Sequence, residues 1–471
     1  MKQVSPSPGI RGEASARRSP RIRNLNGLLA NGKGYTLWQC DLEHCRGGEL
    51  CMYPSYTEHY RYVILALAIF AVCVGSIPVF SLGTLAPLLR DSLNLTREQF
   101  GWLTALFYAG TALVCIPAGW VADRFGVRSP LVAVQTMGAL LLLATPFLHT
   151  YSMLLMVMFL VGIVYGTVTV ITAKAIYEWF PRTLRATAFG ARLCALPVSG
   201  SLAGVAVPVL ALWGGWRQVF AIFGGFMLAS ACSNLLLYRD GPQTMPSSLS
   251  LPTAPPCRSI FRDRNIWWPA ATGFWFGGVK FTSTAYLALF LHEGWRMPLA
   301  HAASLLAQAH LASAPSFVLY GLVSDRWLNG ERKGLFCALG AVAVASLLTL
   351  LLLPSHTSSL ILSALVIVYG LSGLSWGSMY QTLAVEVAGQ GAAGVGIGIT
   401  VSLMYASTTA TAPLFGYVAD MTGSYTLSWG LLILWLLLGI GCLAVMRIAP
   451  VRQSEASRSL PPSLEQMCTK Q

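Results

Sequence analysis

Two basic side chains lie near the middle of long apolar segments of this chain. Lys280 is about fourteen residues into a segment over 266–291, and His310 is similarly central in a segment over 302–323. An ionisable group at the centre of a bilayer costs about 2.5–3.5 kcal/mol on insertion scales, so such residues are usually functional. Lys280 could neutralise an anion, pair with helix carbonyls or snorkel along its helix. His310 could bind a solute, carry a proton or pack as a neutral imidazole.

Further candidate binding residues lie in the same kind of segment. Arg192 and Lys174 are nearer the segment ends, where each could touch a solute or instead snorkel and meet Glu178. Aromatic residues at central depth could line a polar cavity, although most such residues pack in the core. The candidates of this kind are Tyr108, Tyr165, Tyr286 and Trp376.

A short polar motif occurs twice, each time where an apolar segment ends. The first copy contains Gly119, Asp123, Arg124, Gly126 and Arg128. The second copy, interrupted by a two-residue insertion after its arginine, contains Gly321, Asp325 and Arg326. The Gly, Asp and Arg of the second copy each follow those of the first by 202 residues. This internal repeat predicts two similar halves, each with several membrane helices.

The residue types of the motif allow two interpretations. We expect Gly119 to let a neighbouring helix approach closely, and Asp123 to face an arginine or the positive N-terminus of another helix. With Arg124 and Arg128, these charges could form a latch between helix bundles. Alternatively, they only fix the topology of the chain.

Composition independently indicates a membrane protein. Charged residues make up 10% of the chain, hydrophobic residues make up 55%, and the mean hydropathy is +0.61. A soluble protein carries about 25% charged residues. Twelve apolar segments approach the ~20 residues needed to cross a bilayer, and we predict that they are helices because backbone groups in lipid must be satisfied within the segment. They cover 62–85, 100–121, 131–148, 153–176, 188–213, 219–238, 266–291, 302–323, 334–353, 360–384, 392–418 and 427–446.

The basic residues predict the orientation, because cytoplasmic loops are rich in Lys and Arg. If both termini are cytoplasmic, four basic residues lie in outer loops: Arg90, Arg97, Arg217 and Arg296. The inner loops and C-terminal tail then hold fifteen: Arg124, Arg128, Arg182, Arg185, Arg239, Arg258, Arg262, Arg264, Arg326, Arg332, Lys333, Arg447, Arg452, Arg458 and Lys470. This bias predicts cytoplasmic termini and accounts for the net charge of +13 without a nucleic-acid partner.

The chain divides into two helix bundles and three polar segments. Residues 1–60 form a polar tail for which we expect disorder, with Met52 as an alternative start to Met1. The first bundle covers 61–238, a proline-rich cytoplasmic linker covers 239–265, the second bundle covers 266–447, and a cytoplasmic tail covers 448–471. Cys40, Cys45 and Cys51 in the N-terminal tail lack C-x-x-C spacing, so we expect no metal site.

The two motif copies resemble the signature loops of the major facilitator superfamily, which follow the second and eighth spans. The run Trp179-Phe180-Pro181 before span five and the run from Ala412 to Asp420 leaving span eleven are also similar. The resemblance covers residues 60 to about 446. It implies an all-α polytopic membrane protein with two pseudo-symmetric six-helix bundles around a central cavity. It also implies that the bundles rock to expose this cavity to either side, and that the motif latches the outward-facing state.

Departures from the family pattern bear on function. The fourth span lacks the arginine that the family often carries there, and the fifth lacks the Gly-Pro-x-x-Gly-Gly run of many drug antiporters, which favours uptake over efflux. None of the 18 acidic residues is central in a span, although a proton symporter generally relies on a buried carboxylate.

We therefore expect a secondary transporter, and not an enzyme, that imports a small organic or inorganic anion by alternating access. An ion gradient, as in a symporter, or exchange would supply the energy, since no nucleotide-binding loop or cofactor site is found in the sequence. Two alternatives remain: an exporter of drugs or metabolites in which Lys280 excludes cations, and a membrane sensor that no longer transports. We expect the chain to lie in the bacterial inner membrane, with the bilayer, the solute and a coupling ion as partners.

Overall fold

The computed structural model describes residues 35–36, 53–54, 56–180, 182–239, 264–327, 332–354, 356–377, 380, 383 and 393–445. Residues 1–62 and 63–471 form separate compact units. In the first unit, strands β1 (Tyr35–Thr36) and β2 (Tyr53–Pro54) pair antiparallel, which the sequence did not indicate. Met52, the tail cysteines, nearly all of the linker and the C-terminal tail lie outside the described residues.

The described part of the second unit consists of helices and short connections. The helices of the first half of the chain are α1 (Tyr56–Leu93), α2 (Arg97–Phe125), α3 (Arg128–Leu143), the 3₁₀ helix η2 (Thr145–Phe147), α4 (Tyr151–Trp179), α5 (Arg182–Leu193) and α6 (Ala195–Leu237). Those of the second half are α8 (Arg264–Glu293), α9 (Leu299–Trp327), α10 (Arg332–Leu352), α11 (Ser359–Tyr369), the π-helical turn η3 (Gly370–Leu374), α13 (Ala393–Thr422) and α14 (Thr426–Val445). Each of the twelve predicted segments overlaps one of these helices.

Many of the described helices are long enough to cross a membrane. By length and composition, seven runs within the described residues qualify, one of them the 51-residue run Thr187–Leu237. That run contains the fifth and sixth predicted spans, which are separated by non-helical backbone at Gly214 and Gly215. Helices α8, α9 and α13 have 30, 29 and 30 residues, and about 20 residues suffice to cross the hydrocarbon core.

Local sequence signals set the two ends of α2. At its start, the Thr96 side chain accepts a hydrogen bond from Gln99 N while the Gln99 side chain accepts one from Thr96 N, which is a capping box. At its end, Gly126 has φ +76°, a conformation that glycine adopts without steric cost. Helix α2 therefore runs directly from the Arg97 region to the first motif copy.

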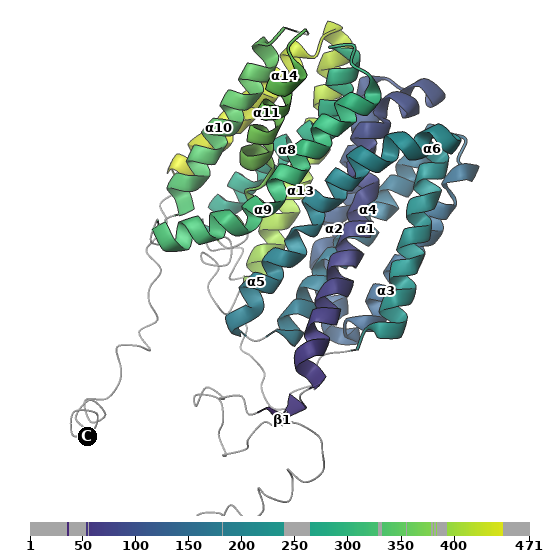
Figure 1. Ribbon diagram of the computed structural model, residues 1–471, viewed down its shortest axis with the longest axis vertical. Helices are drawn as coiled ribbons and strands as arrows, with labels where there is room; N and C mark the ends of the chain where they lie inside the picture. Colours follow the sequence, from purple (N-terminus) through teal and green to yellow (C-terminus); the bar gives the residue numbers. More distant parts are fainter. Residues whose placement is uncertain are drawn as a thin grey trace, which may run out of the picture. The chain divides into compact units, whose positions relative to one another are not determined.

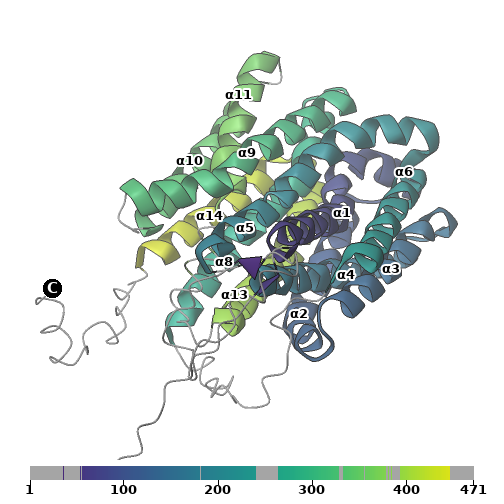
Figure 2. The ribbon, with the colours of Figure 1, turned by 60° about the horizontal axis from the view of Figure 1, so that its bottom comes forward.

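The described helices group into two six-helix bundles, one from each half of the chain. In Figures 1 and 2 the purple-to-teal helices gather together, as do the green-to-yellow ones. Across the boundary, α2 packs on α13 and α6 packs on α9. A Cβ atom at Gly101 would lie 2.5 Å from the Ala412 carbonyl oxygen, and one at Gly416 would meet the Arg97 carbonyl. Glycine thus lets α2 and α13 touch through their backbones.

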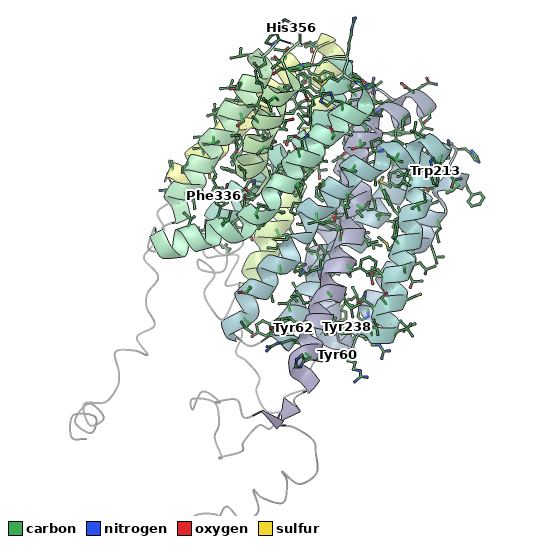
Figure 3. All side chains as sticks on the ribbon, viewed as in Figure 1. Tyr60, Tyr62, Trp213, Tyr238, Phe336 and His356 are labelled. Atoms are coloured by element: carbon green, nitrogen blue, oxygen red, sulfur yellow. The ribbon has the colours of Figure 1, made fainter. Side chains whose placement is uncertain are left out.

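Large apolar side chains cover much of the outward surface of the helices. On α2, Leu113, Ile116 and Trp120 are 58–67% exposed. Trp213, next to the break in α6, is 84% exposed and projects away from the ribbon (Figure 3). Extensive exposed apolar surface marks a surface that something other than water covers, and here it fits a surface in contact with lipid.

Candidate functional site

The Lys280 ammonium lies among aromatic rings in the interior of the bundle. The residue is 8% exposed, and its Nζ lies 5.4 Å from the Phe317 ring centroid, 5.5 Å from Trp376 and 5.7 Å from Phe281. Such ring faces attract a cation, but they do not replace the hydrogen bonds that water supplies to an ammonium. Within the described ranges, no carboxylate or other hydrogen-bond acceptor pairs with this Nζ.

The His310 imidazole lies near Lys280 on the neighbouring helix α9. The residue is 2% exposed, and the ring meets Phe80 edge-on with centroids 5.0 Å apart. Its Nε2 is buried without a hydrogen-bond partner among the described residues. Lys280 is close enough to interact with it electrostatically. The unpartnered His310 nitrogen and the Lys280 ammonium therefore lie in the same region.

Arg192, in the last turn of α5, also faces the interior. It is 2% exposed, and its Nε donates to Thr172 Oγ1 at 2.9 Å while Nη2 donates to the Thr169 carbonyl. The sequence also allowed this side chain to extend towards Glu178, but it does not do so. It lies close enough to Tyr165 and Tyr405 for electrostatic interaction.

A cluster of aromatic residues from both halves connects Arg192 with Lys280. The Tyr165 and Tyr405 hydroxyls are 3.4 Å apart, and the Tyr108 ring stacks on that of Tyr405 at 5.4 Å. Phe281, the neighbour of Lys280, lies 4.4 Å from Tyr108 and 5.3 Å from Tyr405 between ring centroids. These rings and hydroxyls lie between the buried side chains of Arg192 and Lys280.

Two candidate residues lie elsewhere. The Tyr286 hydroxyl donates to the backbone carbonyls of Arg97 and Ala412, so this residue belongs to the contact between α2, α8 and α13. Lys174 donates to the Ala122 carbonyl at 2.6 Å and lies 3.7 Å from Glu178. The predicted contact with Glu178 is therefore present for Lys174, at the end of α4 and beside the first motif copy.

The contacts described for the first motif copy lie within the first half of the chain. Arg124 is exposed and lies over the Trp120 and Phe125 rings of its own helix, and Arg128 donates to the Leu235 carbonyl of the same half. No described atom lies within 4 Å of the position of a Cβ at Gly119, so the close helix approach expected there stays a prediction. The surroundings of Gly321 and the side chains of Asp123, Asp325 and Arg326 are not among the described features.

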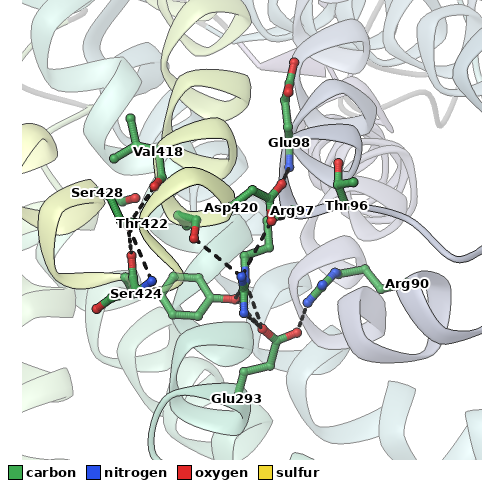
Figure 4. A network of polar contacts seen from close by, with 12 residues as sticks. Arg90, Thr96, Arg97, Glu98, Glu293, Val418, Asp420, Thr422, Ser424 and Ser428 are labelled. Carbon is green, nitrogen blue, oxygen red and sulfur yellow. Dashed lines mark hydrogen bonds and ion pairs between the residues drawn. The ribbon is translucent and has the colours of Figure 1, made fainter.

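At the end of the bundle where α2 begins, five residues form an interbundle charge network (Figure 4). They are Arg90, Arg97, Glu293, Asp420 and Tyr425. Both arginines pair with Glu293, Arg97 at 3.0 Å. The Tyr425 hydroxyl donates to Glu293 Oε2 at 2.7 Å and accepts from Arg97 Nε at 2.9 Å. Burial raises the pKa of Tyr425, an effect that Arg97 opposes, so the hydroxyl stays protonated at neutral pH and can donate.

Asp420 joins the network to the start of α2. Its two oxygens accept from the backbone N–H groups of Arg97 at 3.1 Å and Glu98 at 2.9 Å, at the positive end of the helix. The network is segregated by sign, because both arginines come from α1 and α2 while both carboxylates come from α8 and α13. It therefore attracts one bundle to the other.

Sequence reasoning identified Trp376 but missed these carboxylates and the other two rings around Lys280. Glu293 and Asp420 lie at the ends of second-half spans, on the same predicted side as Arg90 and Arg97, and this pairing of opposite charges was a usable signal. Phe281 and Phe317 carried no signal, because an apolar ring in an apolar span looks like any packing residue.

Comparisons with known proteins agree with the fold. The probable sulfoacetate transporter of Cupriavidus necator is 25% identical over 411 residues, which cover 83% of this chain and 94% of that protein. The probable L-galactonate transporter of Escherichia coli is 24% identical over 395 residues, which cover 77% and 84%. The solved structure of a bacterial homologue of the lysosomal transporter Spinster, inward-facing and occupied, has a TM-score of 0.68 at 16% identity. The match covers 83% of this chain and 99% of that chain.

The family model of the Major Facilitator Superfamily matches residues 65–413. The chain thus belongs to the Major Facilitator Superfamily and is an integral, multi-pass membrane transporter, not an enzyme.

Proposed function

We propose that this protein imports a small organic anion by alternating access and that Lys280 supplies the counter-charge for the bound anion. The observation that carries the proposal is the buried Lys280 ammonium, which has rings on several sides and no acceptor among the described residues. Attraction between opposite charges is far stronger in a low-dielectric interior than in water. A bound carboxylate or sulfonate would supply the missing partner.

The wider charge balance of the interior favours the same class of solute. Lys280 and Arg192 are both buried, and the buried carboxylate among the described residues, Glu178, lies near the end of α4 beside Lys174. An interior with two cations and no central carboxylate in the described ranges repels cations. Sulfoacetate and L-galactonate, the solutes named for two relatives, are both anions.

Alternating access is supported by contacts that close one end of the bundle. The interbundle charge network and the Gly101 and Gly416 contacts join the two halves at the end at which α2 begins. Under the predicted topology in the bacterial inner membrane, the closed end faces outward. We interpret this conformation as the one that is closed to the outside.

The proposal is tested by uptake of labelled sulfoacetate and L-galactonate into proteoliposomes containing the purified protein. Lys280→Ala should lower uptake at least tenfold, because it removes the counter-charge, and Lys280→Arg should retain part of it with altered affinity. Lys333→Ala is a matched control, because Lys333 lies at the start of α10 and donates to the Ala444 carbonyl. Unchanged affinity and rate in Lys280→Ala would make Lys280 a packing residue and remove the main support for an anionic solute.

A further inference from the structure

His310 lies at the boundary between the two bundles. Its helix α9 belongs to the second bundle, while Phe80 of α1 and Gly200 of α6, which flank its ring, belong to the first. A Cβ atom at Gly200 would come within 2.6 Å of His310 Cγ and 2.8 Å of Nδ1. The imidazole therefore occupies the space that a side chain on α6 would fill. If the bundles separate along α6 and α9, water reaches this ring.

Few other groups near His310 can exchange a proton close to neutral pH. The elements packed on this part of α9 bring Lys280 from α8, Tyr369 from α11 and Cys194 from the junction of α5 and α6, whereas α1 brings Phe80. Tyr369 is hydrogen-bonded to Ser283, and Cys194 Sγ lies 3.4 Å from the Ala314 carbonyl oxygen. Of these side-chain types, only histidine changes charge between about pH 5 and 8 in water. No carboxylate among the described residues is buried near this ring.

We propose that His310 carries the proton of an anion–proton symport, taking it up at the unpartnered Nε2 when the anion binds at Lys280. This inference rests on the proposed anion site. A protonated imidazole beside Lys280 would bring two positive charges together in a low-dielectric interior, which is unfavourable. A bound anion offsets this repulsion, so anion and proton each favour the binding of the other, as linkage requires. The proton is released when the bundles separate on the other side and the anion leaves.

The test measures the number of protons moved per anion, which does not depend on the absolute transport rate. Proteoliposomes containing the full chain and a pH-sensitive dye are supplied with labelled L-galactonate from outside. The wild type should acidify the lumen with about one proton per anion, and its accumulation should rise about tenfold per unit of inward proton gradient. His310→Gln keeps a polar side chain that cannot take up a proton, and it should lower the ratio to near zero.

A matched control lies on the same helix. His301 is half-buried near the start of α9, far along the helix from His310, where it is hydrogen-bonded to Ser359, so His301→Gln should keep the wild-type ratio. If His310→Gln does not yield folded protein, His310→Asn replaces it, with folding judged by gel filtration. A variant at position 310 that still moves one proton per anion would overturn the inference, as would a wild type that transports L-galactonate without protons. A wild type that transports neither L-galactonate nor sulfoacetate would instead overturn the proposed function and this inference with it.

Discussion

Gly200 illustrates how a residue without a side chain determines the position of its neighbour. Because the His310 ring lies directly against the α6 backbone, any β-carbon at position 200 must displace it. The contact is between the two bundles, so it also influences how closely they can approach. The placement of His310 thus depends on a residue more than a hundred positions away in the sequence.

We expect Gly200→Ala to destabilise the protein by about 1–3 kcal/mol, the usual cost of inserting an extra methyl group into a packed core. Thermal unfolding of the detergent-solubilised protein measures this. Gly190→Ala is the control, since no described atom lies within 4 Å of a Cβ there, and the loss of glycine within a helix should stabilise it by roughly 0.5–1 kcal/mol. Equal stability of both variants would mean that the His310 ring moves aside at little cost.

At the level of single residues, the depth of a residue in the membrane could be predicted from the sequence, but the direction in which its side chain points could not. Lys280 and His310 are buried as their positions within apolar segments indicated, and Trp376 lies over Lys280. Tyr286 is at a similar depth yet bonds to backbone in a helix contact. The reason is that a helix that is apolar on all sides has no polar stripe to reveal its inward face.

At the level of elements, the interbundle charge network and the glycine contacts close the same end of the bundle. Arg90 and Arg97 were expected only as outer-loop charges that help to set topology. They instead pair with Glu293, which is about two hundred residues away in the chain. The helices themselves could be predicted because hydropathy is local, whereas these pairs could not because they depend on how two bundles dock.

Glu293→Gln and Asp420→Asn should each shift the protein towards the state that is open at the network end. Their ion pairs are 18–27% exposed, and partly exposed pairs are worth about 0–1 kcal/mol each. A loss of about 1 kcal/mol changes the ratio of the two states roughly fivefold. The measurement uses spin labels at positions 91 and 426 in a cysteine-depleted background. The distances between the labels should show a larger population of the state that is open at the network end.

Glu98→Gln provides the control for these variants. Glu98 lies at the same helix end, but its carboxylate accepts from Trp102 of its own helix. This variant should keep the wild-type distance distribution. If the Glu293 and Asp420 variants match it, the network does not hold the bundles together.

At the level of the whole molecule, the repeated motif and the twelve apolar segments predicted the family and the fold. They did not predict which end of the bundle is closed. A transporter has conformations that differ by only a few kcal/mol, so the favoured one depends on a small number of contacts between bundles and not on the overall hydropathy pattern.

Both chain termini should be cytoplasmic, because positive charge is concentrated in the loops on that side. A reporter that folds only in the cytoplasm should be active when fused after Arg264 and inactive when fused after Arg296. Alkaline phosphatase, which requires the outside environment, should give the opposite pattern. The reverse result at both positions would invert the membrane orientation and place the charge network on the inner side.

Because the two arginines and the two carboxylates of the network lie on different bundles, the cost of separating them depends on the salt concentration around the protein. When the bundles part, one rim keeps two positive charges and the other keeps two negative charges, and dissolved ions can gather at each. The Debye length falls from about 30 Å at 0.01 M salt to about 8 Å at 0.15 M, so salt lowers the cost of parting them. Under the predicted orientation, a cell in saline water would have more of its transporters open to the medium than the same cell in fresh water.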